Sequence, residues 1–265
     1  MKRWIPFLKS DPTVAVVRLQ GTIGASGRGV LNDRALAPLL EKAFRRGKPA
    51  AVALEINSPG GSPVQSSLIG ARIRRLAEET GVPVHAFVED VAASGGYWIA
   101  SAADHIWADD SSILGSIGVI SAGFGAHVFL ERQGFERRVH TAGKSKSMLD
   151  PFRPETPEDL ARLTRLLEQL HGTFIAHVQA RRGGKLAEDP ALFTGEVWIG
   201  AAAVSVGLAD GTGHLVPKMK ALYGDKTRFR RFEQKRPLVP RLGLQMVQGA
   251  LTEIEERAQF ARYGL

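Results

Sequence analysis

Residues 91–98 read VAASGGYW, and this stretch between an expected strand and an expected helix decides the fold. A serine among small residues, here Ser94, can present its hydroxyl at a tight turn. Residues 57–61 read NSPGG upstream, and residues 143–146 read GKSK downstream. Glycine amides can bind a developing oxyanion, and a buried neutral lysine can take the proton of a serine. The three stretches together predict a site for acyl transfer.

Apolar patterns around these motifs alternate between strand and helix. Expected strands cover residues 14–19, 50–56, 82–88 and 105–108, expected helices cover 32–46, 63–79 and 156–182, and a helix with a closing strand is expected in 195–210. Nearly continuous apolar strands that alternate with helices indicate a mostly parallel sheet. Ligands bind at the carboxyl ends of the strands in such sheets, which is where both glycine-rich motifs stand.

Two of the expected helices carry capping signals. Asn32 or Asp33 can cap the first helix, and Thr156 can cap the third, with Pro157 at its first position. The third helix has an apolar face made of Leu160, Leu163, Leu167, Leu170, Phe174 and Val178. This spacing is typical of an amphipathic helix.

The composition is that of a globular α/β protein with a basic surface. The chain has 265 residues, of which 44% are hydrophobic and 23% charged, with no cysteine and a net charge of +8. The lack of cysteine excludes disulfides, thiolate metal sites and a cysteine nucleophile. No nucleic-acid-binding motif accompanies the positive charge, so we expect no nucleic-acid partner.

Targeting signals are weak in this sequence. Lys2 and Arg3 imitate the start of a signal peptide, but the apolar run that follows is short and contains Pro6. No run of about 18 apolar residues occurs anywhere. We therefore expect neither a signal peptide nor a transmembrane helix, and a cytoplasmic protein whose contact with a membrane, if any, is peripheral.

The segment 52–118 joins NSPGG and AASGGYW through a helix and a strand, and in this it resembles the signal peptide peptidase A family of serine proteases. The resemblance extends over about residues 14–215. It implies a ClpP/crotonase-like fold, with mostly parallel sheets built from repeated β-β-α units and helices outside. It also implies a serine endopeptidase that cleaves signal-peptide remnants or unfolded or small proteins through a Ser-Lys dyad.

The resemblance assigns the nucleophile to Ser94 and the general base to Lys146 rather than Lys144. No histidine stands a couple of dozen residues after the serine, where a ClpP-type triad would need one. A free lysine amine has a pKa of about 10.4, so about one in 10³ is neutral near pH 7.4. A lysine base therefore needs burial, which we expect from Met148 and Leu149.

Three glycines are the expected oxyanion donors: Gly60 or Gly61 from the first motif and Gly95 from the second. Ser116 matches a family serine thought to bond the lysine amine. No metal-ligand motif or phosphate-binding loop occurs, so we expect no metal and no cofactor.

The chain is divided here into an N-terminal tip (1–13), a peptidase domain (14–225) and a basic segment with a C-terminal helix (226–265). The last helix carries an apolar seam made of Leu244, Val247, Leu251, Ile254, Ala258 and Ala261. This seam packs either on the chain's own core or on another subunit. Family members form rings, so we expect a homo-oligomer that binds peptides or unfolded proteins.

Two other functions fit parts of the sequence. A crotonase-like acyl-CoA enzyme would use the same oxyanion hole, but it needs acid/base carboxylates near the glycine turns, and none is identifiable. A catalytically weak family member could serve as a membrane-associated scaffold through the basic stretch RFRRF at residues 228–232. Intact dyad residues favour the peptidase.

Overall fold

The structure is a computed structural model that describes residues 11–25, 30–234 and 257–265. The expected N-terminal tip is therefore described only from residue 11, and Leu244 to Ile254 of the expected seam lie outside the described residues. The chain forms two compact units. The first unit comprises residues 1–117 and 175–265, and the second comprises residues 118–174.

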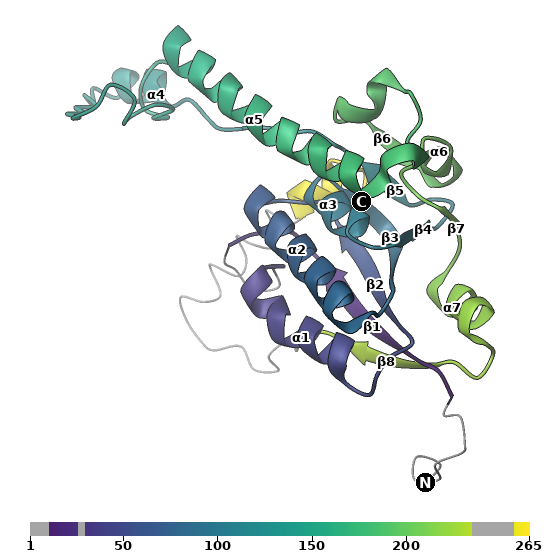
Figure 1. Cartoon of the computed structure of the whole chain (residues 1–265). Coiled ribbons are helices and arrows are strands. Elements are labelled where there is room, and N and C mark those ends of the chain that lie inside the picture. The colour runs from purple at the N-terminus through teal and green to yellow at the C-terminus, as the bar shows by residue number, and fades with distance from the viewer. Residues whose placement is uncertain (1–10, 26–29, 235–256) are drawn as a thin grey trace. The chain divides into compact units, whose positions relative to one another are not determined.

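In its described part, the first unit holds one eight-stranded sheet (Figure 1). Its strands are β1 (Thr13–Gln20), β2 (Ala51–Ser58), β3 (Val84–Ala93), β4 (His105–Ala108), β5 (Ile113–Gly115), β6 (Val197–Ile199), β7 (Gly211–Thr212) and β8 (Arg228–Phe232). The order is β6-β5-β3-β2-β1-β8, and β4 pairs with β3 and β7. The pairs are parallel except for β5 with β6, which confirms the predicted mostly parallel sheet.

Helices cover both faces of this sheet (Figure 1). The helices of the first unit are α1 (Asp33–Arg45), α2 (Pro63–Thr80), α3 (Gly95–Ser101), α6 (Gly200–Ser205) and α7 (Leu215–Tyr223), with 3-10 turns at η2 (Gly183–Lys185) and η3 (Pro190–Phe193). α1 and α2 lie on one face, and α7 lies on the other. There Leu215 and Met219 of α7 pack on Val14, Val16 and Ala53. Every residue of β2 is buried, because both faces of the sheet are covered.

The helix ends follow the capping signals. The side chain of Asn32 accepts a hydrogen bond from the amide of Ala35 (2.9 Å), which identifies Asn32 as the cap of α1. α2 begins at Pro63 after Ser62, and it ends at Gly81, whose φ of 66° suits a glycine. The Asn32 cap therefore fixes where α1 begins, as the sequence predicts, whereas no cap was predicted for α2.

α5 (Pro157–Arg182) runs from the second unit into the first. Thr156 caps it by accepting a hydrogen bond from the Asp159 amide (3.2 Å). Its predicted apolar face is buried only at the C-terminal end. Phe174 and Val178 are buried, whereas Leu160 and Leu170 are exposed.

The second unit consists of α4 (His127–Arg132), the first part of α5 and loops. Its loops are joined by contacts such as the ion pair between Arg137 and Asp150 (3.3 Å). Several aromatic side chains are exposed, and Phe124 is 93% exposed, Phe129 64% and Phe135 68%. This unit therefore presents apolar surface that its own residues do not cover.

One part of the sheet was not predicted. The stretch 228–232, expected only as a basic segment, forms β8 and pairs in parallel with β1, with Arg228 beside Thr13 and Phe232 beside Val17. Arg231 of β8 also forms an ion pair with the buried Glu55 (2.6 Å). The sheet thus continues past residue 225.

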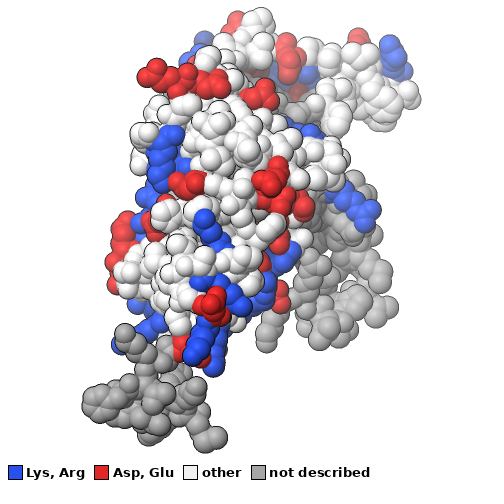
Figure 2. Space-filling view, turned by 90° about the vertical axis from the view of Figure 1, so that its right-hand side faces the viewer, with Lys and Arg blue, Asp and Glu red and all other residues white. Residues whose placement is uncertain are grey.

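Basic and acidic side chains are interspersed on the face of the molecule shown in Figure 2. On this face, the lysine and arginine side chains therefore lie among carboxylates. Among the described residues, no helix is both long enough and apolar enough to cross a membrane.

Candidate active site

Ser94 stands at the turn between β3 and α3. Its φ of 52° and ψ of −121° are rare for a residue with a side chain, and such strain often occurs at functional sites. The turn is held at both ends, because the Ser94 amide donates to the carbonyl of Gly115 (2.9 Å) and its carbonyl accepts from Trp98 (3.0 Å). Every other residue from 91 to 100 is buried, so Ser94 alone in this stretch reaches the surface.

Gly60 packs directly against this turn. A Cβ added to Gly60 would stand 2.8 Å from the carbonyl oxygen of Ala93 and the amide nitrogen of Gly95. At Gly61, an added Cβ would stand 2.0 Å from the carbonyl oxygen of Ile23. Both glycines have positive φ, 104° and 140°. Glycine is therefore required at both positions, because a side chain would clash with the protein's own backbone.

The amides of these glycines differ in their partners. The Gly60 amide donates to the Ser58 hydroxyl (3.3 Å), whereas the amide of Gly61 donates to no described residue. Gly95 is the first residue of α3, where an amide has no acceptor inside its own helix. Gly61 and Gly95 thus have amides without an acceptor among the described residues.

Ser116 occupies the same edge of the sheet as Ser94. Ala93 pairs with Gly115, so each serine directly follows a paired strand residue. The Ser116 amide donates to the carbonyl of Glu196 (2.7 Å), and its hydroxyl accepts from the hydroxyl of Tyr263 (3.3 Å). The sequence did not predict that Tyr263 lies near Ser116, because no motif around this tyrosine indicates such a contact.

Lys146 lies in the second unit, in a turn where its amide donates to the carbonyl of Gly143 (3.2 Å). Its side chain is exposed, and so is that of Lys144. Met148 is only half-buried and Leu149 is exposed. The burial that we expected from these two neighbours is therefore absent around Lys146.

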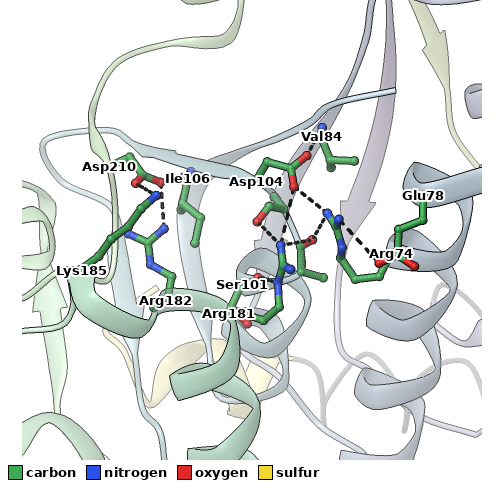
Figure 3. Close-up of polar contacts among 12 residues, drawn as sticks. Arg74, Glu78, Val84, Ser101, Asp104, Ile106, Arg181, Arg182, Lys185 and Asp210 are labelled. Atoms are coloured by element: carbon green, nitrogen blue, oxygen red, sulfur yellow. Dashed lines mark hydrogen bonds and ion pairs between the residues drawn. The ribbon is translucent and has the colours of Figure 1, made fainter. Parts of the chain in front are cut away.

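The C-terminal end of α3 is held by three charged residues, Arg74, Asp104 and Arg181 (Figure 3). Arg181 of α5 donates to the carbonyls of Ser101 (3.0 Å) and Ala103 (3.1 Å), where the last carbonyls of a helix lack partners. Arg74 of α2 pairs with Asp104 (2.7 Å), and Asp104 also accepts from the first amide of β3 (2.8 Å). This network joins α2, α5 and β3 to the helix that follows Ser94.

A second charged group lies beside the first (Figure 3). Asp210 accepts from Arg182 (2.8 Å), Lys185 (2.6 Å) and the amide of Ile106 (2.7 Å). The Arg182 side chain is 2% exposed. Burial opposes ionisation, but these hydrogen bonds lower the pKa of Asp210 to about 2. Sequence reasoning missed both networks, because their partners are far apart in the chain.

His177 of α5 stacks on the ring of Trp98 in α3, with centroids 4.4 Å apart. Its Nε2 lies 3.0 Å from the Ser101 hydroxyl and 3.2 Å from the carbonyl of Trp98. Burial lowers the pKa of His177, although the Trp98 carbonyl works against this. The histidine therefore supports α3 as a neutral ring. Within the described part of the chain, no group of three or more His, Asp or Glu side chains is placed to hold a metal ion.

Comparisons with known proteins give the family. The family model described as "Peptidase family S49" matches residues 77–223. The whole chain aligns at 47% identity with the Na(+)/H(+) antiporter NhaA of Brucella melitensis, yet it spans only 39% of that protein's length. It is 34% identical to Protease 4 of Haemophilus influenzae, over 76% of this chain and 32% of that protein.

A solved structure of the 1510-N membrane-bound stomatin-specific protease has the same fold. The TM-score is 0.53 at 14% sequence identity, over 88% of this chain and 100% of that one. This likeness confirms the ClpP/crotonase-like fold expected from the sequence. Because the family model matches more than half of the chain, the chain belongs to peptidase family S49.

Proposed function

We propose that this chain is a serine endopeptidase whose nucleophile is Ser94 and whose general base is Lys146. The observation that carries the proposal is the Ser94 turn, where a strained serine faces outward beside two glycines packed against it. Such a turn exposes a hydroxyl and uncovered amides at one place. Membership of a peptidase family and the likeness to Protease 4 support the same reaction.

In the proposed mechanism, the Ser94 hydroxyl attacks the peptide carbonyl while the neutral Lys146 amine takes its proton. The carbonyl oxygen gains negative charge, which the amides of Gly95 and Gly61 stabilise. Lys146 then returns the proton to the leaving amine, and an acyl-enzyme forms on Ser94. Water activated by the same amine hydrolyses this ester, and Ser116 holds the amine in place.

The proposed substrates are extended peptides, such as signal-peptide remnants or unfolded segments of proteins. The proposed active form is a homo-oligomer. The exposed side chains of Lys146 and of Phe124, Phe129 and Phe135 support it, since a neutral base requires an enclosed environment. Light scattering tests the assembly, and a monomer at micromolar concentration would contradict it.

The deciding experiment labels the protein with a fluorophosphonate probe and measures peptide hydrolysis in parallel. Ser94→Ala should abolish labelling, and Lys146→Ala should lower kcat/KM by about 10³-fold or more. Lys144→Ala is the matched control and should keep wild-type activity. In the wild type, kcat/KM should rise with pH, because only the neutral amine accepts a proton.

Three outcomes would overturn the proposal. Loss of activity in Lys144→Ala with an active Lys146→Ala variant would show that the other lysine is the base. Labelling that persists in Ser94→Ala would remove the nucleophile. Hydrolysis of acyl-CoA thioesters without peptide hydrolysis would favour the crotonase-like alternative.

A further inference from the structure

The strand that leads to Ser94 contains a bulge. Ile56 of β2 pairs with Val88 of β3, and Ser58 pairs with Ala92. One residue, Asn57, stands between the pairs on β2, whereas three stand between them on β3. The two extra residues take Glu89 and Asp90 out of regular pairing, and bulges of this kind are common beside active sites.

The bulge is fixed by buried groups. The hydroxyl of Ser112, which is buried, lies 3.0 Å from the carbonyl of Val88 and 2.5 Å from that of Glu89. Arg18 of β1 donates to the Glu89 carboxylate (3.1 Å). The backbone of the bulge and the Glu89 carboxylate are therefore held in place.

A cavity of about 520 Å³ opens beside the bulge, within the first unit. Four carboxylates line it, those of Glu55, Glu89, Asp90 and Asp109. Its described lining residues include His214 and several apolar side chains but neither lysine nor arginine. The lining is therefore strongly acidic, although the chain as a whole is basic.

Two of the four carboxylates already have cationic partners. Glu55 pairs with Arg231 (2.6 Å) and with Arg18 (3.7 Å), and Arg18 also pairs with Glu89 (3.1 Å). Asp90 accepts a hydrogen bond from the side-chain amide of Asn57, and Asp109 lies 3.6 Å from the exposed His214. In the described part of the chain, no lysine or arginine neutralises Asp90 or Asp109.

Asn57 of β2 lies opposite the bulge and contacts Asp90, one of the four carboxylates. Its side-chain Nδ2 donates to Asp90 (2.5 Å), and the residue is only 6% exposed. Its Oδ1 is buried and accepts no hydrogen bond from the described residues. A buried acceptor without a donor is costly, but Asn57 is not among the residues that line the cavity, so its contribution is to hold the Asp90 carboxylate.

The carboxylates of Asp90 and Asp109 are thus the acidic lining groups that no described lysine or arginine neutralises, and their complement is a positively charged donor. A lysine ammonium or an arginine guanidinium supplies several N–H donors and no acceptor. We propose that this cavity binds a lysine or arginine side chain of the peptide substrate. The inference rests on the proposed function.

The position of the cavity indicates why the ligand is part of a peptide. Asp90 lies near the end of β3, four residues before Ser94, and an extended chain of that length spans at most about 14 Å. An extended peptide bound at Ser94 would place a side chain at the cavity within about four residues of the cleaved bond. In addition, burial raises the pKa of Glu89, with Arg18 opposing and Glu55 and Asp90 reinforcing, and a bound cation would relieve this.

The test is a set of peptides that carry lysine, arginine, norleucine or citrulline at each position up to four residues from the cleaved bond. In the wild type, kcat/KM should be about 10-fold or more higher for the basic residues at one position. Asp90→Asn should remove this preference while still cleaving the norleucine peptide. Asp110→Asn is the matched control, since Asp110 is exposed and does not line the cavity.

The subsite and the peptidase activity can fail separately. Equal kcat/KM for basic and neutral peptides in an active wild type would overturn the subsite alone. If no peptide is cleaved, the proposed function fails, and calorimetric binding of the arginine peptide to Ser94→Ala still decides the subsite. Asp109→Asn provides a second variant should Asp90→Asn not fold, and an unchanged preference in it would also count against the cavity.

Discussion

A Cβ added to Gly60 would stand 2.8 Å from the Cβ of Ser94. The turn after β2 and the turn after β3 are thus in direct contact, and the side chain missing at Gly60 leaves the space in which Ser94 lies. Because β2 and β3 are parallel neighbours, the turns that follow them pack against each other without space for an additional side chain at Gly60.

Gly60→Ala should therefore lose activity. The added methyl group must displace Ser94 or the Gly95 amide, and loss of one oxyanion donor typically costs about 10²- to 10³-fold in kcat. Gly81→Ala is the matched control, because Gly81 also has positive φ but meets no atom within 4 Å. It should lose stability but keep its kcat/KM, and wild-type activity in Gly60→Ala would refute the contact.

Two inactive variants of Ser94 should differ in stability. At a φ of 52°, glycine is free of the strain that a Cβ causes, so Ser94→Gly should be more stable than Ser94→Ala by about 1 kcal/mol. Chemical denaturation measures the difference. An alanine variant at least as stable as the glycine variant would show that the turn is not strained.

Asp210→Ala should be strongly destabilising. It leaves the buried Arg182 without its carboxylate, a change that typically costs about 3–5 kcal/mol. Asp11→Ala is the control, because its partner Arg228 is 71% exposed and such pairs contribute about 1 kcal/mol or less. Similar losses in the two variants would contradict a special role for Asp210.

The Asp210 carboxylate also makes the free energy of unfolding depend on pH. The pKa of Asp210 is about 2 in the folded protein and about 3.9 when unfolded. Its contribution is therefore complete above about pH 4 and is lost as the pH falls toward 2. Stability measured across this range should fall less steeply in Asp210→Asn than in the wild type, and parallel curves would contradict the assignment.

His85 should make the protein less stable in mild acid. Burial, with smaller effects of His105 and Lys218, lowers its pKa to about 4, although Asp104 opposes. The unfolded chain therefore binds a proton first, and the free energy of unfolding should fall between about pH 6.5 and pH 4, by at most about 1.4 kcal/mol per pH unit. His85→Gln should flatten this dependence. An equal slope in the variant would exclude His85 as the cause.

The sequence predicted those parts of the fold that depend on local patterns. The apolar run of β2 and the cap at Asn32 identified a buried strand and a helix start, because burial and capping involve neighbours in the chain. The same holds for Gly60, whose motif follows a strand. Such features need no knowledge of distant partners.

Features that depend on distant partners were missed. β8 alternates arginine with phenylalanine, and its role became visible only through Glu55 and β1, far away in the sequence. The cavity beside Asp90 likewise combines residues from β2, β3 and the segment before α7. Met148 and Leu149, although close to Lys146 in sequence, do not bury it.

The pairing of β8 with β1 has a consequence for how the protein is made. β1 leaves the ribosome long before its partner, residues 228–232. Until then β1 has an unpaired edge rich in valine, the kind of edge that invites pairing with another chain. Contacts of such long sequence separation also slow folding. During synthesis, the edge of β1 is therefore open to pairing with other chains until the arginine-rich segment 228–232 has been made and pairs with it.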